Sequence, residues 1–230
     1  MQSKHLFLWG HPRSLSTAME VYFRARGDYR VVHEPFADAY WKGTSAPDKL
    51  EHLLDLSESN DLPLFAKDIA HHIPQQILAD GRLINSFSHV ILIRSPLAAF
   101  HSHLKVNPEV KDHEFGYEAL YKVFQLITEI TGKHPQILQA DRLLADAEST
   151  IKNFCGDAGI PHLPEALSWK PKSHSEWQAA DKWQTKAGAS HGFEQMAKSQ
   201  LPALPKRLQE VFKLHEANYH RLLAAASSKN

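Results

Sequence analysis

The sequence predicts a domain of the α/β class, a three-layer sandwich in which helices cover both faces of a five-stranded parallel sheet. The first observation is a set of short apolar or β-branched runs, at residues 5–9, 30–33, 62–66, 89–93 and 136–140. The second is that these runs are followed by loops or by segments with the apolar spacing of amphipathic helices. Strands that alternate with helices are typical of a parallel sheet built with right-handed crossovers.

The runs at 5–9 and 89–93 are almost wholly apolar, which indicates strands buried on both faces of the sheet. The helical segments are expected at 16–26, 48–57, 73–80, 96–105, 114–131 and 145–158. A closing helix is expected at 204–226, where one apolar stripe should pack back on the sheet. The stretch 168–193 contains three tryptophans and little periodicity, so we expect a long ordered loop that covers a site.

Length and composition indicate a single domain over residues 1–230 and exclude several function classes. A chain of 230 residues is long enough for one large core and too short for two. The 26 Lys and Arg residues balance the 26 Asp and Glu residues, so the formal net charge is zero. The charge of the chain therefore does not indicate nucleic acid or a membrane as a partner. Cys155 is the only cysteine, and no apolar run approaches the roughly 20 residues of a membrane span. We expect a cytoplasmic protein, and the sequence leaves its oligomeric state open.

Residues 10–17, which follow the first strand and open a helix, have the pattern of a phosphate-binding loop. They read Gly-His-Pro-Arg-Ser-Leu-Ser-Thr, which matches the length of the motif Gly, four residues, Gly-Lys-Ser/Thr. Leu15 and Ser16 replace its second Gly and its Lys, and Arg13 supplies the positive charge. Hydroxyl groups and a guanidinium at a helix N-terminus bind anions, although Ser and Thr there also serve simply as helix caps. The predicted P-loop-like anion site consists of Pro12, Arg13, Ser14, Leu15, Ser16 and Thr17.

The fourth strand is followed by Arg94, where a phosphate-loop NTPase would carry a carboxylate that holds Mg²⁺. A cation at this position repels Mg²⁺ and attracts a second phosphate group. The carboxyl ends of parallel strands meet at one edge of the sheet, so we expect Arg13 and Arg94 to lie near each other. The sequence therefore predicts two anion sites and no metal site.

These two segments resemble the motifs of PAPS-dependent sulfotransferases. Residues 12–17 are similar to the 5′-phosphosulfate loop of that family, usually Pro-Lys-Ser-Gly-Thr-Thr, with Leu15 in place of the Gly. Arg94, followed by Ser95, Pro96 and, eight residues after the Arg, Ser102, is similar to its 3′-phosphate motif. The resemblance covers roughly residues 5–169. It implies metal-independent, in-line transfer of a sulfuryl group from 3′-phosphoadenosine 5′-phosphosulfate (PAPS) to a hydroxyl or amine of a small acceptor.

Such a transfer needs cations near the leaving phosphate, because charge develops there in the transition state. We expect Arg13 to meet the bridging oxygen and Lys67, directly after the third strand, to assist it. In the family a C-terminal Arg-Lys-Gly segment closes over the 3′-phosphate, and that motif is missing here. Lys186, or Lys182, is the candidate for its role.

The base that takes the acceptor proton has three candidates. The cytosolic sulfotransferases carry their catalytic His two residues after the corresponding Lys, and this sequence has Ile69 there. His71 and His72 follow shortly after and have side chains suited to base catalysis. Glu34 ends the second strand, and some bacterial sulfotransferases that resemble this chain use a Glu from that neighbourhood. The two histidines rank slightly above Glu34, which would otherwise cap the chain or pair with Arg13.

Two other function classes remain as alternatives. A nucleotide or small-molecule kinase on the same fold would need a Lys at position 16 and a metal-binding carboxylate, and neither is present. A non-catalytic nucleotide-binding module would keep the fold without the base, as Ile69 permits. The sequence does not identify the acceptor. The aromatic candidates for contact with a ring-bearing acceptor or with the adenine are Trp41, Trp169, Trp177 and Trp183.

Overall fold

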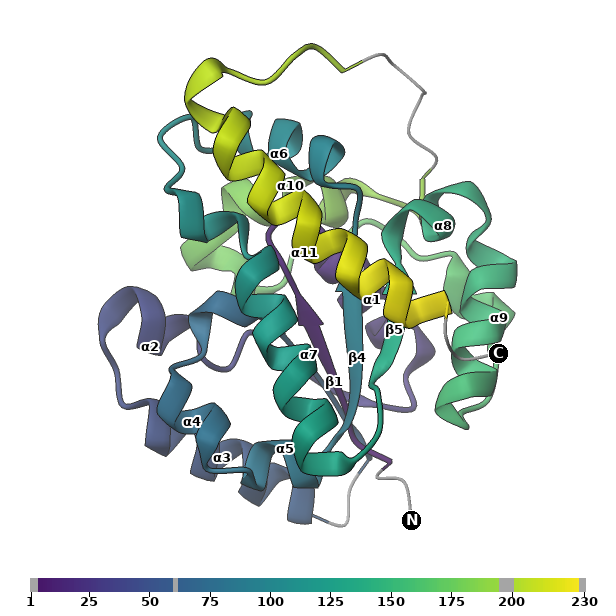
Figure 1. Ribbon diagram of the computed structural model, residues 1–230. Helices are drawn as coiled ribbons and strands as arrows, with labels where there is room; N and C mark the ends of the chain where they lie inside the picture. The colour runs from purple at the N-terminus through teal and green to yellow at the C-terminus, as the bar shows by residue number, and fades with distance from the viewer. Residues whose placement is uncertain (1–3, 60–61, 195–200, 228–230) are drawn as a thin grey trace.

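The computed structural model describes residues 4–59, 62–194 and 201–227, and within them a five-stranded sheet forms the centre of the molecule (Figure 1). The strands are β1 (Leu6–Gly10), β2 (Arg30–His33), β3 (Leu64–Ile69), β4 (Ser88–Ile93) and β5 (Gln136–Gln139). All neighbours pair in parallel, in the order β2-β3-β1-β4-β5. Helices lie on both faces of this sheet, so the predicted three-layer α/β fold is confirmed.

Each helical segment expected from the sequence overlaps one of the described helices, and further helices that the sequence analysis did not predict lie between them. The described helices are α1 (Ser16–Arg26), α2 (Ala37–Lys42), α3 (Ala46–Glu58), α4 (Gln75–Ala79), α5 (Arg82–Ser86), α6 (Pro96–Leu104), α7 (Tyr117–Thr131), α8 (Ala140–Ala145), α9 (Ala147–Ala158), α10 (Asp181–Ala189) and α11 (Gln209–Ser227). The closing helix α11 packs across α7 and beside β5, as its apolar stripe predicted. Among the described helices none is long and apolar enough to cross a membrane.

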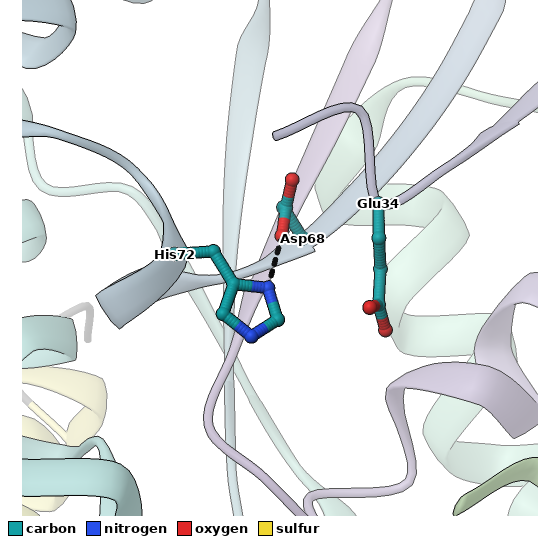
Figure 2. Close-up of side chains that lie close together, drawn as sticks. All are labelled: Glu34, Asp68 and His72. Atoms are coloured by element: carbon teal, nitrogen blue, oxygen red, sulfur yellow. Dashed lines mark hydrogen bonds and ion pairs between the residues drawn. The ribbon is translucent and has the colours of Figure 1, made fainter. Parts of the chain in front are cut away.

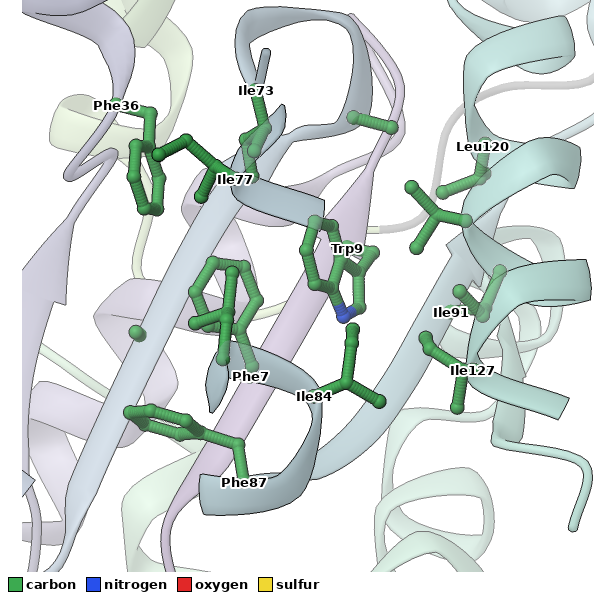
Figure 3. Close-up of a cluster of buried hydrophobic side chains, with 14 of the residues drawn as sticks. Phe7, Trp9, Phe36, Ile73, Ile77, Ile84, Phe87, Ile91, Leu120 and Ile127 are labelled. Carbon is green, nitrogen blue, oxygen red and sulfur yellow. The ribbon is translucent and has the colours of Figure 1, made fainter. Parts of the chain in front are cut away.

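The central strand β1 divides the core into two layers. Phe7 and Trp9 point to one face, where they pack with side chains of α3, α5 and α7 (Figure 3). Leu6 and Leu8 point to the other face, where they pack with α1 and α9. Because successive side chains of a strand alternate between faces, a strand covered on both sides needs an apolar run without alternation.

Strand β3 corrects the boundary expected at 62–66, because it begins at Leu64 and continues to Ile69. Lys67 and Asp68 interrupt the apolar run and suggested that the strand ends before them. In the structure both are completely buried inside the strand and pair with β1. Lys67 contacts two carboxylates, and Asp68 accepts hydrogen bonds from two backbone N–H groups and from His72. Lys67 is therefore part of the sheet and does not follow it.

The covering segment, residues 168–193, is not an irregular loop throughout. It contains a 3-10 turn, Ser175–Ala180, followed by helix α10, and an isolated bridge between Ser168 and Gly192 closes its base. Trp169 and Trp177 are buried and anchor this segment on the core, so they are not free to contact a ligand. Part of the expected loop is therefore helical, and the sequence interpretation missed helix α10.

His89 on β4 is held in its neutral form by two hydrogen bonds. Its Nδ1 accepts from Trp9 Nε1 at 2.9 Å, and its Nε2 lies 2.9 Å from the carbonyl oxygen of Ile84, to which it donates. Burial lowers the pKa of His89 to about 4. Protonation would convert the Nδ1 acceptor into a donor that faces the Trp9 donor.

The protein should lose stability in acid partly through His89. Its folded pKa of about 4 lies below the unfolded value of 6.5, so the unfolded chain takes up the proton first as the pH falls. The contribution of this group to the free energy of unfolding is constant above about pH 6.5. It should decline by roughly 3 kcal/mol between pH 6.5 and pH 4, because each unit of pKa difference corresponds to about 1.4 kcal/mol.

Urea unfolding at several pH values tests this expectation by comparison of the wild type with His89→Gln. The variant should have a shallower pH dependence of stability between pH 6.5 and pH 4. The exposed His220→Gln variant serves as the matched control for loss of a histidine. Parallel curves for the wild type and His89→Gln would contradict the assignment.

Candidate active site

The loop between β1 and α1 lies at the carboxyl edge of the sheet and forms the predicted anion site. Arg13 and Leu15 have φ angles of 66° and 74°, left-handed values that bend the chain sharply before α1 begins at Ser16. Gly10 leaves room for this loop, because a Cβ there would lie 2.9 Å from Ser14 Oγ. The loop therefore folds back closely on the end of β1.

A cavity of about 1140 Å³ opens beside this loop. Its walls come from the loop, from the segments that follow β2 and β3, from α6 and from the covering segment. The predicted site residues that line it are Pro12, Arg13, Leu15, Ser16, Thr17, Glu34, His71, His72, Arg94, Ser102 and Lys186. Ser14 and Lys67 do not line it, because both side chains are completely buried. The Oγ of Ser14 has no hydrogen-bond partner among the described residues, and its contact with an anion stays a prediction.

Arg13 and Arg94 lie together, as their places after the adjacent strands β1 and β4 predicted. Arg94 Nη1 donates to the carbonyl oxygen of Arg13 at 2.9 Å. Arg13 Nε donates to Ser102 Oγ at 3.0 Å, and its Nη1 donates to the carbonyl oxygen of Trp183 on α10 at 2.8 Å. Burial lowers the pKa of both guanidinium groups, and the charge of Arg94 lowers that of Arg13 further. Two partly desolvated cations beside one cavity favour an anionic ligand.

Lys67 is a buried cation beside the phosphate loop. Its Nζ lies 2.6 Å from Glu34 Oε1 and 3.7 Å from Glu20 Oε2, and it donates to Thr17 Oγ1 at 3.5 Å. Burial alone lowers the pKa of Lys67, but the two carboxylates outweigh burial and raise it. Burial favours the neutral form of Glu34, but Lys67 and His33 outweigh burial and lower its pKa. Glu34 is thus the counter-ion of Lys67 and not, as the alternative interpretation held, a partner of Arg13.

Glu20 is a site-supporting residue that the sequence interpretation missed. Its carboxylate is completely buried on α1, where it lies 2.6 Å from His33 Nδ1 and accepts from Trp177 Nε1 at 3.1 Å. Arg24 donates to it from the next turn of the helix. Burial opposes the charge of Glu20, but His33 and Lys67 outweigh burial and lower its pKa. The feature that could have revealed it is the position of Glu20 one turn after Ser16, on the face of α1 that is buried.

Asp68 and His72 form a second hydrogen-bonded pair at the cavity (Figure 2). Asp68 is completely buried and accepts backbone N–H groups from Phe36 at 2.8 Å and from Ile69 at 2.7 Å. Its Oδ1 lies 3.0 Å from His72 Nδ1. Because a carboxylate only accepts, Nδ1 carries a proton, and in the neutral imidazole of His72 the lone pair is then on Nε2. Figure 2 shows Nε2 on the side of the ring away from Asp68.

Three atoms that could bind a metal ion lie within 4.8 Å of one another, one each from Glu34, Asp68 and His72. Two observations oppose a divalent cation there. The Lys67 ammonium is 2.6 Å from the Glu34 carboxylate and would repel it. The oxygens of Asp68 already accept two backbone N–H groups and the imidazole. The donor set fits a buried ion pair beside an Asp–His pair better than a metal centre.

His71, the third candidate base, has a different environment from its neighbour. Its Nδ1 is buried and has no hydrogen-bond partner among the described residues. Burial lowers the pKa of His71 well below its usual range, and the nearby imidazoles of His72 and His113 lower it further. The ring of His71 lines the cavity, but no described side chain orients it by a hydrogen bond.

Comparison with known proteins identifies the family. A family model for the sulfotransferase domain matches residues 4–217, and the chain belongs to that family. Two curated relatives, the branched-chain-amino-acid aminotransferase-like proteins 2 and 1 of Arabidopsis thaliana, are 31% identical over 175 and 176 residues. These matches cover 70% of this chain and 31% of either relative, so the chain spans about a third of their length.

Two solved structures of sulfotransferases have the same fold. The sulfotransferase domain of the olefin synthase from Synechococcus PCC 7002 superimposes with a TM-score of 0.58 at 14% identity, over 96% of each chain. A sulfotransferase from Alicyclobacillus acidocaldarius superimposes with a TM-score of 0.51 at 10% identity, over 100% of this chain and 98% of that one. At this level of identity the comparison shows the fold alone.

Proposed function

We propose that this protein is an enzyme that transfers a sulfuryl group from PAPS to a hydroxyl or amine of a small acceptor, without a metal. The observation that carries the proposal is the pair Arg13 and Arg94, which join the phosphate loop and the end of β4 at one wall of the cavity. A donor with phosphate groups at both its 3′ and 5′ positions needs two such anion sites. Membership of the sulfotransferase-domain family supports the same activity.

In this proposal the donor lies along the carboxyl edge of the sheet. Arg94 and Ser102 bind the 3′-phosphate, and Lys186 on α10 adds a cation from the covering segment. The loop residues Pro12 to Thr17 surround the 5′-phosphosulfate, where the N-terminus of α1 attracts negative charge. Positioning and charge stabilisation supply most of the rate enhancement in a transfer of this kind.

The leaving group is adenosine 3′,5′-bisphosphate, and its bridging oxygen gains negative charge as the S–O bond breaks. Arg13 is the nearest cation of the loop. Lys67 acts from below the loop through Thr17, to which it donates at 3.5 Å. The pair with Glu34 keeps Lys67 charged in its buried position, so the cation is in place before the donor arrives. The acceptor proton then goes to His71, His72 or Glu34.

Binding of adenosine 3′,5′-bisphosphate should be equally strong in EDTA and in Mg²⁺, because arginine and lysine side chains supply the positive charge. Isothermal titration calorimetry of the bisphosphate in both buffers measures this directly, and Mg·ATP serves as the competing ligand. A strong requirement for Mg²⁺, or tighter binding of Mg·ATP, would instead favour the kinase alternative.

A further inference from the structure

Trp41 and His72 are aromatic residues that line the cavity, and the ring of Tyr40 packs against both of them without lining it. Trp41 at the end of α2 lines the cavity with 59% of its surface exposed, and α2 buries none of its residues. The ring centroid of Trp41 lies 4.7 Å from that of Tyr40 and 5.8 Å from that of His72. The Trp41 side chain packs in no core and faces the cavity, so a ligand that covers this apolar surface would be bound more tightly. We call Tyr40, Trp41 and His72 the aromatic recess.

His72 is the candidate base that the structure prepares for proton transfer. Asp68 fixes its Nδ1 at 3.0 Å, and the Tyr40 ring lies against the imidazole at a centroid distance of 4.9 Å. These contacts set the orientation of the ring and leave Nε2 for the acceptor. The carboxylate of Asp68 also stabilises the imidazolium that forms when His72 takes a proton.

The other two candidate bases lack this preparation. The Glu34 carboxylate is 2.6 Å from the Lys67 ammonium, and proton uptake by Glu34 would break that buried pair. The Nδ1 of His71 has no hydrogen-bond partner among the residues that the structure describes, so nothing defines its tautomer.

We propose that the aromatic recess binds a phenolic acceptor, a hydroxyl group on an aromatic ring, and that His72 Nε2 takes the hydroxyl proton with Asp68 as its positioning residue. This inference rests on the function proposed above. The acceptor oxygen forms a bond to the sulfur of PAPS as the bond from sulfur to the bridging phosphate oxygen breaks. The electron pair of the broken bond leaves on adenosine 3′,5′-bisphosphate, and the proton remains on His72 until solvent removes it.

Two physical arguments favour a phenol over an alkyl alcohol. A flat ring can stack on or meet edge-on the exposed face of Trp41, which an alkyl chain cannot match. A phenol also loses its proton at a pKa of about 10, whereas an alkyl hydroxyl resembles water, at about 15.7. A neutral imidazole is a much better matched base for the more acidic group.

The acceptor class is tested with 2-naphthol and its saturated analogue decahydro-2-naphthol, which have the same carbon skeleton. The wild type with PAPS should sulfate 2-naphthol at least tenfold more efficiently, measured as kcat/KM. Trp41→Ala should raise the KM for 2-naphthol roughly 3- to 10-fold, and Trp41→Phe should restore most of the loss. Equal turnover of the two alcohols, or no effect of Trp41→Ala, would overturn the assignment of the recess.

The base is tested with His72→Gln and Asp68→Asn. His72→Gln should lower kcat with 2-naphthol roughly 10²- to 10⁴-fold. Asp68→Asn should lower kcat by a smaller factor while the KM for 2-naphthol and the affinity for the bisphosphate stay unchanged, a split that a general loss of structure would not produce. The surface variant His220→Gln is the matched control. A His72→Gln enzyme with wild-type kcat, or a loss just as deep in His71→Gln, would overturn the choice of base.

Calorimetry with adenosine 3′,5′-bisphosphate separates the two levels of the argument. If the protein binds the bisphosphate but does not sulfate 2-naphthol, the inference about the acceptor fails and the donor site stands. If the bisphosphate does not bind, the proposed function itself is wrong.

Discussion

Alanine at Arg94 should weaken the binding of adenosine 3′,5′-bisphosphate by about 1.5–3 kcal/mol, the usual loss for a hydrogen bond to a charged group. The binding of the donor PAPS should be weakened by the same amount, because the 3′-phosphate is the same in donor and product. Arg13→Ala should instead lower kcat more than it weakens binding, since Arg13 meets charge that grows only in the transition state.

The Ser102→Ala variant tests whether the Ser102 hydroxyl acts with Arg94 or with Arg13. The family motif assigns Ser102 to the 3′-phosphate with Arg94, and in the structure its Oγ accepts from Arg13 Nε at 3.0 Å. A small loss of bisphosphate affinity without a change in kcat is expected. The measurements are calorimetry of the bisphosphate and PAPS turnover for the three variants. Unchanged bisphosphate affinity in Arg94→Ala would show that the 3′-phosphate assignment is wrong.

Lys67→Met should cause the largest loss of stability of any single change considered, about 3–5 kcal/mol. The substitution removes the ammonium and leaves two carboxylates without it: that of Glu20, which is completely buried, and that of Glu34, whose side chain is 11% exposed at the cavity. Urea unfolding monitored by tryptophan fluorescence measures the change.

The matched control is Lys122→Met, which breaks an exposed pair with Glu118 at 2.7 Å. That variant should lose less than about 1 kcal/mol, as exposed ion pairs do. The double variant Lys67→Met with Glu34→Gln should recover part of the loss, because one buried charge is then removed. Equal stability of Lys67→Met and Lys122→Met would contradict the buried-pair interpretation.

Most of the fold was predictable because the apolar pattern and the helical period are local signals. The helix at 16–26 and the strand at 30–33 agree with α1 and β2 to the residue. The boundary of β3 was not predictable, because the charge of Lys67 is matched by Glu34 and Glu20, which are distant in the sequence. A single charged residue in an apolar run predicts a strand end unless its partner is known.

The two arginines of the site were predictable for a related reason. Arg13 and Arg94 each follow a strongly apolar strand, and topology then brings them to one edge of the sheet. The Asp68–His72 pair was not predictable, because it depends on the 3-10 turn Ala70–His72 after β3, which places His72 back over Asp68. Without that turn, nothing in the sequence distinguishes His72 from His71.

The backbone of the cavity wall has a further consequence for ligand binding. Arg13, Leu15 and Glu34 are the non-glycine residues with positive φ in the described part of the chain, and all three line the cavity. Left-handed conformations cost non-glycine residues roughly 1–2 kcal/mol each, so the local chain would not choose them by itself. The packing of the strands and helices around them imposes these conformations. The site is therefore preorganised, and a ligand that enters it loses little affinity to the entropy of ordering the backbone.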